Sequence, residues 1–282
     1  MKWQGRRGSR NIEDRRGSSA GRAGGIGGVG LVVVLVLAYF LGIDPSALLQ
    51  GGGGGTIQSG GGQVTQADEQ AGQFVSVTLA DTEEIWAQIF ENELQRRYVP
   101  PTLVLFKGAT QSSCGGANGA TGPFYCPVDK KVYLDTDFFT MMSQRMGAKG
   151  DFAAAYVVAH EVAHNVQDQL GILSQANELR RQVDTAQSNA ISVRIELQAD
   201  CYSGIWARHA EAKFGSIEPG DLQEAVNAAK QIGDDTLQRN AGRRPMPHTF
   251  THGTSEQRQR WFATGYQTPD IAACDTFGTN NL

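Results

Sequence analysis

The sequence has no excess of positive charge, no internal repeat and no C-x-x-C pair. Its formal net charge is −4, which argues against a protein that binds nucleic acid by neutralising phosphates, so no nucleic-acid partner is expected. The missing C-x-x-C spacing argues against a zinc ribbon and against a thiol-redox motif. With 282 residues, the chain has room for one main domain with appended segments.

Charge is also missing from residues 23–43, which contain the apolar run GLVVVLVLAYFLGI. About 20 apolar residues in a helix span a hydrocarbon core of roughly 30 Å. A cleaved signal peptide would have a shorter apolar core and a small-residue cleavage site, and a buried core helix would not follow a basic stretch. The pattern therefore predicts one transmembrane helix at residues 23–43, with the lipid bilayer as a partner.

The flanks of this run predict its orientation. Residues 1–22 carry only two acidic side chains against the basic residues Lys2, Arg6, Arg7, Arg10, Arg15, Arg16 and Arg22. By the positive-inside rule we expect residues 1–22 to form a basic cytoplasmic tail and the chain after Asp44 to lie outside the cytoplasm. Residues 44–74 are rich in Gly, Gln and Ser and predict a flexible linker before a folded domain at residues 75–282.

The cysteines bear on that orientation, because all four follow the apolar run. Cys114 and Cys126 bracket a Gly-rich loop that a disulfide closes easily, which leaves Cys201 and Cys274 to pair and to clip the C-terminal tail to a helix. In a reducing cytosol the same residues would be free thiols. We expect two disulfides and an oxidising compartment.

Hydrophobic periodicity predicts an α+β domain that is predominantly helical. Residues 102–106 and 131–135 have the composition of strands, and a helix is expected to begin near Asp81. Further helices are expected at residues 138–146 and 151–171 and around residues 196–214. Thr254 and Gln257 form a capping box for a last helix.

The sequence AHEVAHN contains an H-E-x-x-H motif at His160, Glu161 and His164. Positions i and i+4 of a helix face the same way, so both imidazoles can bind one zinc ion. Glu161 then points toward the open metal position and can accept a proton from bound water, whose pKa zinc lowers to about 7. The alternative is a pair of buried core histidines.

Zinc hydrolases need a third protein ligand, and ELQAD offers Glu196 with Asp200 one turn later. Glu196 is the predicted ligand, and Asp200 is placed to accept the free ring N–H of a ligand histidine. The competing candidates are His209, His248 and His252. A solvated helix face is the other interpretation of Glu196 and Asp200.

E-x-x-x-D after H-E-x-x-H resembles the thermolysin-type zinc peptidases, the gluzincins. The segments SSCGGANGATGPFYCPVDKKVYLD, AHEVAHNVQ, ELQADCYSGIWA and THGTSEQRQRWFATG resemble the bacterial family of putative neutral zinc metallopeptidases along nearly the whole chain. This resemblance implies a single-pass protein of the bacterial inner (plasma) membrane. It also implies a zincin-like periplasmic domain that holds one Zn²⁺ per chain.

The gluzincin resemblance also implies roles for residues outside the two motifs. A late histidine donates to the oxyanion in gluzincins, which favours His252 over His248, although a structural histidine in a Pro-rich loop is the alternative. Gluzincin architecture further suggests that Tyr133 and Leu134 form a strand edge for an extended peptide.

The predicted function is a membrane-anchored zinc peptidase that hydrolyses peptide bonds with metal-activated water. Its partner is a protein or peptide substrate, and the residues set no oligomeric state. Two alternatives share the zinc ligands. One is a catalytically silent, zinc-stabilised envelope scaffold or chaperone, and the other is a zinc amidase that acts on peptidoglycan peptides.

Overall fold

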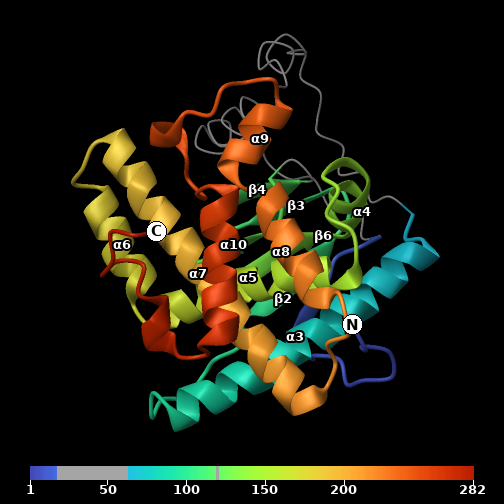
Figure 1. The fold of residues 1–282 in the computed structure, drawn as a ribbon. Coiled ribbons are helices and arrows are strands. Elements are labelled where there is room, and N and C mark those ends of the chain that lie inside the picture. The colour runs from blue at the N-terminus through green and yellow to red at the C-terminus, as the bar shows by residue number, and fades with distance from the viewer. Residues whose placement is uncertain (18–62, 119–120) are drawn as a thin grey trace.

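The structure is a computed structural model that describes residues 1–17, 63–118 and 121–282 (Figure 1). The expected transmembrane helix at residues 23–43 lies outside these ranges. Within them, no helix is both long enough and apolar enough to cross a membrane.

The described chain is a mostly helical α+β structure, as predicted. Four strands form one sheet in the order β1-β2-β6-β5, with β1 (Ile12–Asp14), β2 (Thr102–Phe106), β6 (Lys131–Asp135) and β5 (Phe124–Cys126). The first three strands run parallel and β5 runs antiparallel to β6. A separate hairpin consists of β3 (Ala109–Ser112) and β4 (Gly115–Asn118). The strands predicted at residues 102–106 and 131–135 are confirmed.

The helices surround a central one, α5 (Asp151–Gln169), which packs against α7 (Thr185–Phe214) and α8 (Asp221–Gln231) (Figure 1). The helices α3 (Gln66–Asn92), α4 (Thr136–Arg145) and α6 (Ile172–Arg180) precede or join them. The C-terminal part consists of α9 (Asp234–Asn240), η1 (Pro247–Thr249), α10 (Ser255–Gln267) and η2 (Ile271–Cys274). The capping box predicted at Thr254 and Gln257 begins α10.

Helices α7 and α10 approach each other closely because each has a glycine, Gly204 in α7 and Gly265 in α10, at the point of contact. A Cβ on Gly204 would lie 2.1 Å from the carbonyl oxygen of Phe262, and a Cβ on Gly265 would lie 1.8 Å from that of Cys201. No other side chain fits at these two positions. The contact fixes α10 beside the part of α7 that carries Glu196 and Asp200.

The first folded residues differ from the expected boundaries. The linker predicted at residues 66–74 and the helix start predicted near Asp81 are wrong, because Thr65 and Asp68 form a capping box that begins α3 at Gln66. The buried side chain of Asp68 also accepts a hydrogen bond from Thr136 at 2.9 Å. These tertiary contacts compensate for the low apolar content of the segment.

Residues 1–17 also differ from the separate basic tail that the charge pattern predicted. Strand β1 pairs with β2 in parallel, with Ile12 opposite Leu103 and Asp14 opposite Leu105. Trp3 packs edge-on against Phe74 of α3, with ring centroids 5.6 Å apart. In the structure, residues 1–17 therefore belong to the same folded body as residues 63–282.

Candidate metal centre

The H-E-x-x-H motif lies in the middle of α5, where every turn is buried. Its small residues, among them Ala155, Ala159 and Ala163, let neighbouring elements approach the helix closely. One helical turn separates His160 from His164, and their rings lie 4.9 Å apart at an interplanar angle of 88°. Both imidazoles therefore face the same neighbour, as the i, i+4 spacing predicted.

That neighbour is Glu196 of α7. Its Oε2 lies 3.0 Å from Nε2 of His160, and its Oε1 lies 3.6 Å from Nε2 of His164. One ligand atom from each of the three side chains lies within 4.8 Å of the others. The structure brings together the three predicted ligands and places neither His209 nor His248 in this group.

The outer nitrogen of each histidine is held by a buried side chain. Nδ1 of His160 lies 2.9 Å from Oδ1 of Asp200, and Nδ1 of His164 lies 2.8 Å from Oε1 of Gln167. The amide of Gln167 donates in turn to the carbonyl oxygen of Ile195 at 2.8 Å. Such outer partners fix the ring orientation and leave both Nε2 atoms directed at Glu196. The sequence predicted Asp200 in this place and missed Gln167.

Asp200 has further partners that the sequence analysis also missed. Arg258 of α10 donates to both carboxylate oxygens of Asp200, from Nε at 2.8 Å and from Nη2 at 2.9 Å. Tyr156, one turn before His160, donates its hydroxyl to the same carboxylate. Burial opposes the charged form of Asp200, yet Arg258 and His160 lower its pKa. Asp200 is therefore a buried anion held in one orientation.

The electrostatics of the group favour a cation. Burial alone would lower the pKa of His160, but Asp200 and Glu196 raise it to about 10. Glu196 has a pKa well below its usual range, because the neighbouring His164 and His160 outweigh the effect of burial. The two carboxylates that raise this pKa would also attract a zinc ion, whose binding requires the inner nitrogen to be free of its proton. Two imidazoles and one carboxylate are a donor set that zinc accepts.

Glu161 lies beside the ligands on α5 and is buried. Burial raises the pKa of its carboxyl group, while the nearby His164 and His160 lower it by a smaller amount. A raised carboxyl pKa brings the group closer to the working range of a general base. Within the described residues, the Glu161 carboxylate accepts no hydrogen bond from the protein, and it is therefore available to a water molecule.

His252 lies in the loop between η1 and α10, and its charge acts on Glu196. A single carboxylate, Asp234, holds this loop by accepting backbone N–H groups from Thr251, His252 and Gly253 at 2.8, 2.6 and 3.1 Å. Nδ1 of His252 lies 3.3 Å from Asp234, and burial opposes the rise that Asp234 and Glu196 cause in its pKa. Sequence analysis missed Asp234, whose role depends wholly on tertiary contacts.

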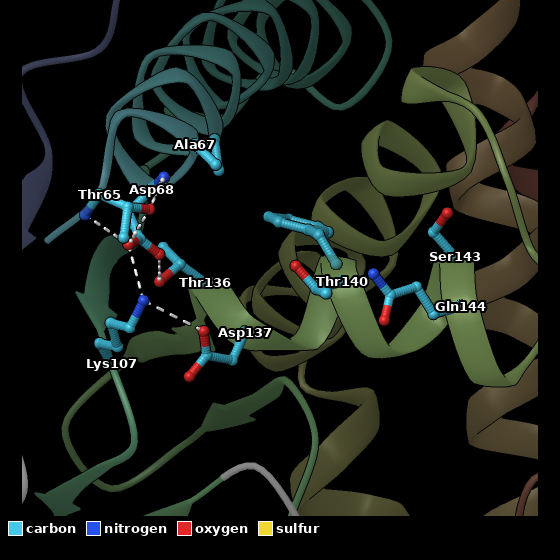
Figure 2. Close-up of a pocket in the computed structure, with 11 residues that line it drawn as sticks. Thr65, Ala67, Asp68, Lys107, Thr136, Asp137, Thr140, Ser143 and Gln144 are labelled. Carbon is cyan, nitrogen blue, oxygen red and sulfur yellow. Dashed lines mark hydrogen bonds and ion pairs between the residues drawn. The ribbon is translucent and has the colours of Figure 1, made fainter. Parts of the chain in front are cut away.

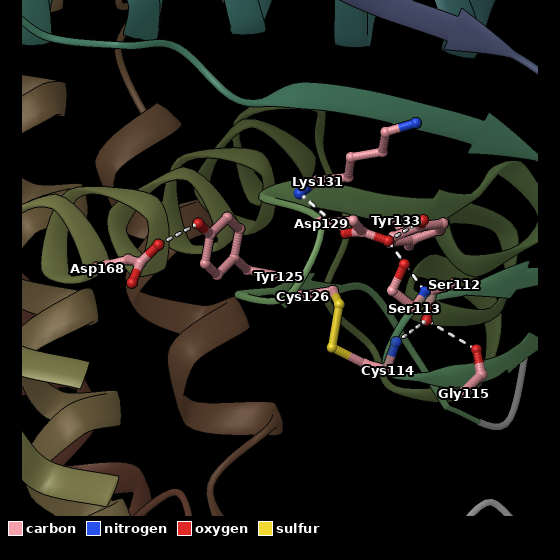
Figure 3. The surroundings of a disulfide bond; sticks show 10 residues. All are labelled: Ser112, Ser113, Cys114, Gly115, Tyr125, Cys126, Asp129, Lys131, Tyr133 and Asp168. Atoms are coloured by element: carbon pink, nitrogen blue, oxygen red, sulfur yellow. Dashed lines mark hydrogen bonds between the residues drawn. A yellow bond between two sulfur atoms is a disulfide. The ribbon is translucent and has the colours of Figure 1, made fainter. Parts of the chain in front are cut away.

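Both predicted disulfides are present, Cys114–Cys126 and Cys201–Cys274. Figure 3 shows that the first joins the hairpin β3–β4 to strand β5, beside Tyr125, whose hydroxyl donates to Asp168 of α5 at 2.9 Å. The second links α7, one residue after Asp200, to η2. Each bridge fixes a segment that borders the candidate centre.

The strand edge expected at Tyr133 and Leu134 is not an edge. Both residues lie in β6, which pairs with β2 on one side and with β5 on the other. Among the described strands, β5 forms the end of the sheet nearest α5. The error arose because local composition cannot show which of two adjacent strands is outermost.

A cavity of about 360 Å³ lies away from the metal centre, between the start of α3 and α4 (Figure 2). Its charged lining is already paired, because Nζ of Lys107 lies 2.7 Å from Asp68 and 3.3 Å from Asp137. The cavity contains none of the predicted site residues.

Comparison with known proteins agrees with the geometry. The family described as putative neutral zinc metallopeptidase matches residues 1–277. The chain is 44% identical over 287 residues to the uncharacterized protein YpfJ of Escherichia coli (strain K12), covering 99% of both chains. It is 46% identical over 196 residues to the uncharacterized protein Rv2575 of Mycobacterium tuberculosis, covering 66% of this chain and 65% of that one. No solved structure matches the chain. The chain belongs to the putative neutral zinc metallopeptidase family.

Proposed function

We propose that this protein is a zinc-dependent peptidase in which His160, His164 and Glu196 hold the metal. The observation that carries the proposal is the convergence of both Nε2 atoms on one carboxylate from a second helix, with each outer nitrogen already engaged. A bound zinc ion would supply an activated water and polarise the scissile carbonyl.

Glu161 is the general base of the proposed reaction. Its carboxylate accepts the proton of the attacking water and passes it to the departing amine. Burial, which raises its pKa, makes the protonated form accessible during the reaction. A zinc-stabilised scaffold would have no use for a buried carboxylate next to the ligands, so Glu161 favours the enzyme over the silent alternative.

His252 is proposed to donate to the oxyanion of the tetrahedral intermediate. The Asp234 hydrogen bonds to the loop fix its backbone, and its raised pKa favours the protonated donor form. A fixed donor aimed at developing negative charge lowers the barrier more than one that must reorganise. The substrate is proposed to be an extended peptide beside β5, which lies against α5.

The catalytic domain is proposed to work outside the cytoplasm. All four cysteines of the chain are paired, and disulfides persist in oxidising compartments such as the periplasm. The uncharged run at residues 23–43 supports attachment to the bacterial inner membrane.

The test compares the full chain with Glu161→Gln. We expect the wild-type protein to hold about one zinc ion and to cleave casein until a chelator is added. Glu161→Gln should keep the zinc and lose cleavage by roughly a thousandfold or more, because the base is missing while the ligands remain. Glu178→Gln on the exposed face of α6 is the matched control and should cleave normally. Equal cleavage by Glu161→Gln would refute the proposed mechanism.

A further inference from the structure

Residues 1–17 make main-chain hydrogen bonds to elements that begin far along the chain. The N–H of Ser9 donates to the carbonyl of Ser76 in α3 at 2.9 Å, and that of Arg15 donates to the carbonyl of Leu105 in β2 at 2.8 Å. Leu103 donates to the carbonyl of Asn11 at 2.8 Å. With β1 in place, β2 is no longer the end of the sheet, so its backbone groups are satisfied.

The side chains of this segment meet complementary charges on α3. Arg6 forms a bidentate pair with Asp81, with both N–O distances at 2.7 Å, and Arg7 lies 3.9 Å from Glu84. The side-chain amide of Asn11 donates to Glu83 at 2.8 Å. Asp81 is only 3% exposed, and a carboxylate so far from water needs a partner such as Arg6.

The same pattern continues at the end of the segment. Arg16 pairs with Asp14 at 2.7 Å and lies 3.5 Å from Glu69 of α3. Glu13 pairs with Lys131 of β6 at 2.6 Å. Three of the basic residues behind the cytoplasmic-tail prediction, Arg6, Arg7 and Arg16, thus have counter-charges on α3.

We propose that residues 1–17 are an integral part of the catalytic domain, docked on the β2 edge and α3 of the same chain, on the same side of the membrane as residues 63–282. A single crossing between Gly17 and Gln63 would put about 30 Å of hydrocarbon between Arg6 and Asp81, a pair whose atoms lie 2.7 Å apart. This inference does not depend on zinc binding or on cleavage.

A disulfide between positions 8 and 76 tests the docking. A Cβ on Gly8 would lie 3.4 Å from Cβ of Ser76, close to the roughly 3.5–4.5 Å usual in disulfides. The protein used in the test is the full chain with the substitutions Gly8→Cys and Ser76→Cys and with a specific protease site inserted within residues 51–62. After cleavage in membranes under mild oxidation, we expect the N-terminal fragment to stay attached on a non-reducing gel and to separate on reduction.

Gly5→Cys with Ser76→Cys is the matched control. A Cβ on Gly5 has no atom within 4 Å, so this cysteine pair should form no disulfide. The native cysteines do not compete, since all four are paired. Release of the fragment from the Gly8→Cys, Ser76→Cys protein would overturn the proposal. A bond that forms only between two copies of the chain would overturn docking within one chain.

The shared side of the membrane is tested with a membrane-impermeant maleimide on two exposed positions, Arg10→Cys and Glu178→Cys. We expect both cysteines to react under the same conditions, either in intact cells or only after the inner membrane is opened. If one cysteine reacted in intact cells and the other reacted only after the inner membrane was opened, the inference would be overturned. Both readouts are independent of enzyme activity, so they can fail while the proposed peptidase function stands.

Discussion

Two groups of potential metal ligands lie along α5, and only one suits zinc. At the start of the helix, Asp151 lies beside Asp221 and Glu224 of α8. In the middle of the helix, His160 and His164 face Glu196 of α7. In each group the ligand atoms lie within 4.8 Å of one another. The groups differ in what the protein itself supplies to balance their charge.

The first group already holds a cation that the chain itself supplies. The ammonium group of Met1 lies 2.9 Å from Asp151 and 3.1 Å from Asp221. Burial would lower its pKa, but these carboxylates raise it to about 10. Glu224 accepts the N–H of Phe152 at 3.1 Å and so caps α5, whose N-cap Gly150 has no side chain to do so.

In the second group, no ammonium or guanidinium group of the described residues lies against the Nε2 atoms of His160 and His164. Arg258 balances Asp200 on the far side of His160, and Gln167 holds His164 without charge. Glu196 therefore meets only the imidazoles and the positive potential of His252. Closeness of ligand atoms is therefore a weak criterion for a zinc site, whereas imidazole donors whose outer nitrogens are held by other side chains are a stronger one.

The largest expected effect separates the two groups by matched amide substitutions. Glu196→Gln removes one of the three proposed zinc ligands, and we expect zinc affinity to fall roughly a thousandfold, more than the 10–100-fold typical of losing a partner of a ligand. Glu224→Gln keeps an acceptor for Phe152 and should bind zinc normally. Competition with a zinc-chelating dye measures both. Equal loss in the two variants would remove the distinction between the groups.

A second substitution tests the charge balance behind His160. Arg258→Met leaves Asp200 buried without its partner, which should lower the free energy of unfolding by about 3 kcal/mol. Arg260→Met, two residues along the same helix, should change it by less than about 0.5 kcal/mol, as is usual at sites without a buried partner. Thermal unfolding in the presence of chelator measures both, so that zinc release does not contribute. A stable Arg258→Met would mean that Asp200 has other compensation.

The smallest expected effect concerns pH and residues 1–17. Burial raises the pKa of Asp81 to about 6, although Arg6 lowers it. In the unfolded chain the value is about 3.9, so the folded state binds more protons between pH 4 and 6. The contribution of Asp81 to the free energy of unfolding is therefore highest below pH 4 and falls as the pH rises to 6.

This loss should amount to about 2 kcal/mol. Asp81→Asn should remove it, so that the difference in unfolding free energy between the variant and wild type changes across pH 4–6. The exposed Glu256→Gln serves as the control for a general change of charge. Chemical denaturation of the metal-free protein at several pH values provides the measurement. A constant difference for Asp81→Asn would show that Arg6 fully offsets the effect of burial on the pKa of Asp81.

Much of the fold was predictable where the signal was local. The strands at residues 102–106 and 131–135 follow from β-branched and aromatic runs, and α5 begins at Asp151 as its periodicity indicated. The Thr254 capping box and both cysteine pairings were also correct. Convergence of Glu196 on the histidines followed from two i, i+4 pairs.

Other features depended on partners that no local pattern reveals. The place of β5 outside β6, which removes Tyr133 from the edge, depends on how the strands pair. The start of α3 does have a local signal, the capping box of Thr65 and Asp68, although the Gly-rich composition of residues 44–74 predicts a linker. Asp234 and Arg258 gave no sequence signal, because each acts on a residue in a different element. Gln167 could have been found, since it lies three residues after His164 on the same helix face.

The sequence by itself determined the chemistry: the ligand types, their helical spacing and the cysteines available for bridges. These depend on side-chain identity and on the helical period, which are properties of short segments. Tertiary structure alone decided which carboxylate meets which cation, that β1 extends the sheet beside β2, and that only one of the two ligand groups combines imidazoles with a carboxylate. Those outcomes depend on distances between residues far apart in the chain, which only the packed fold sets.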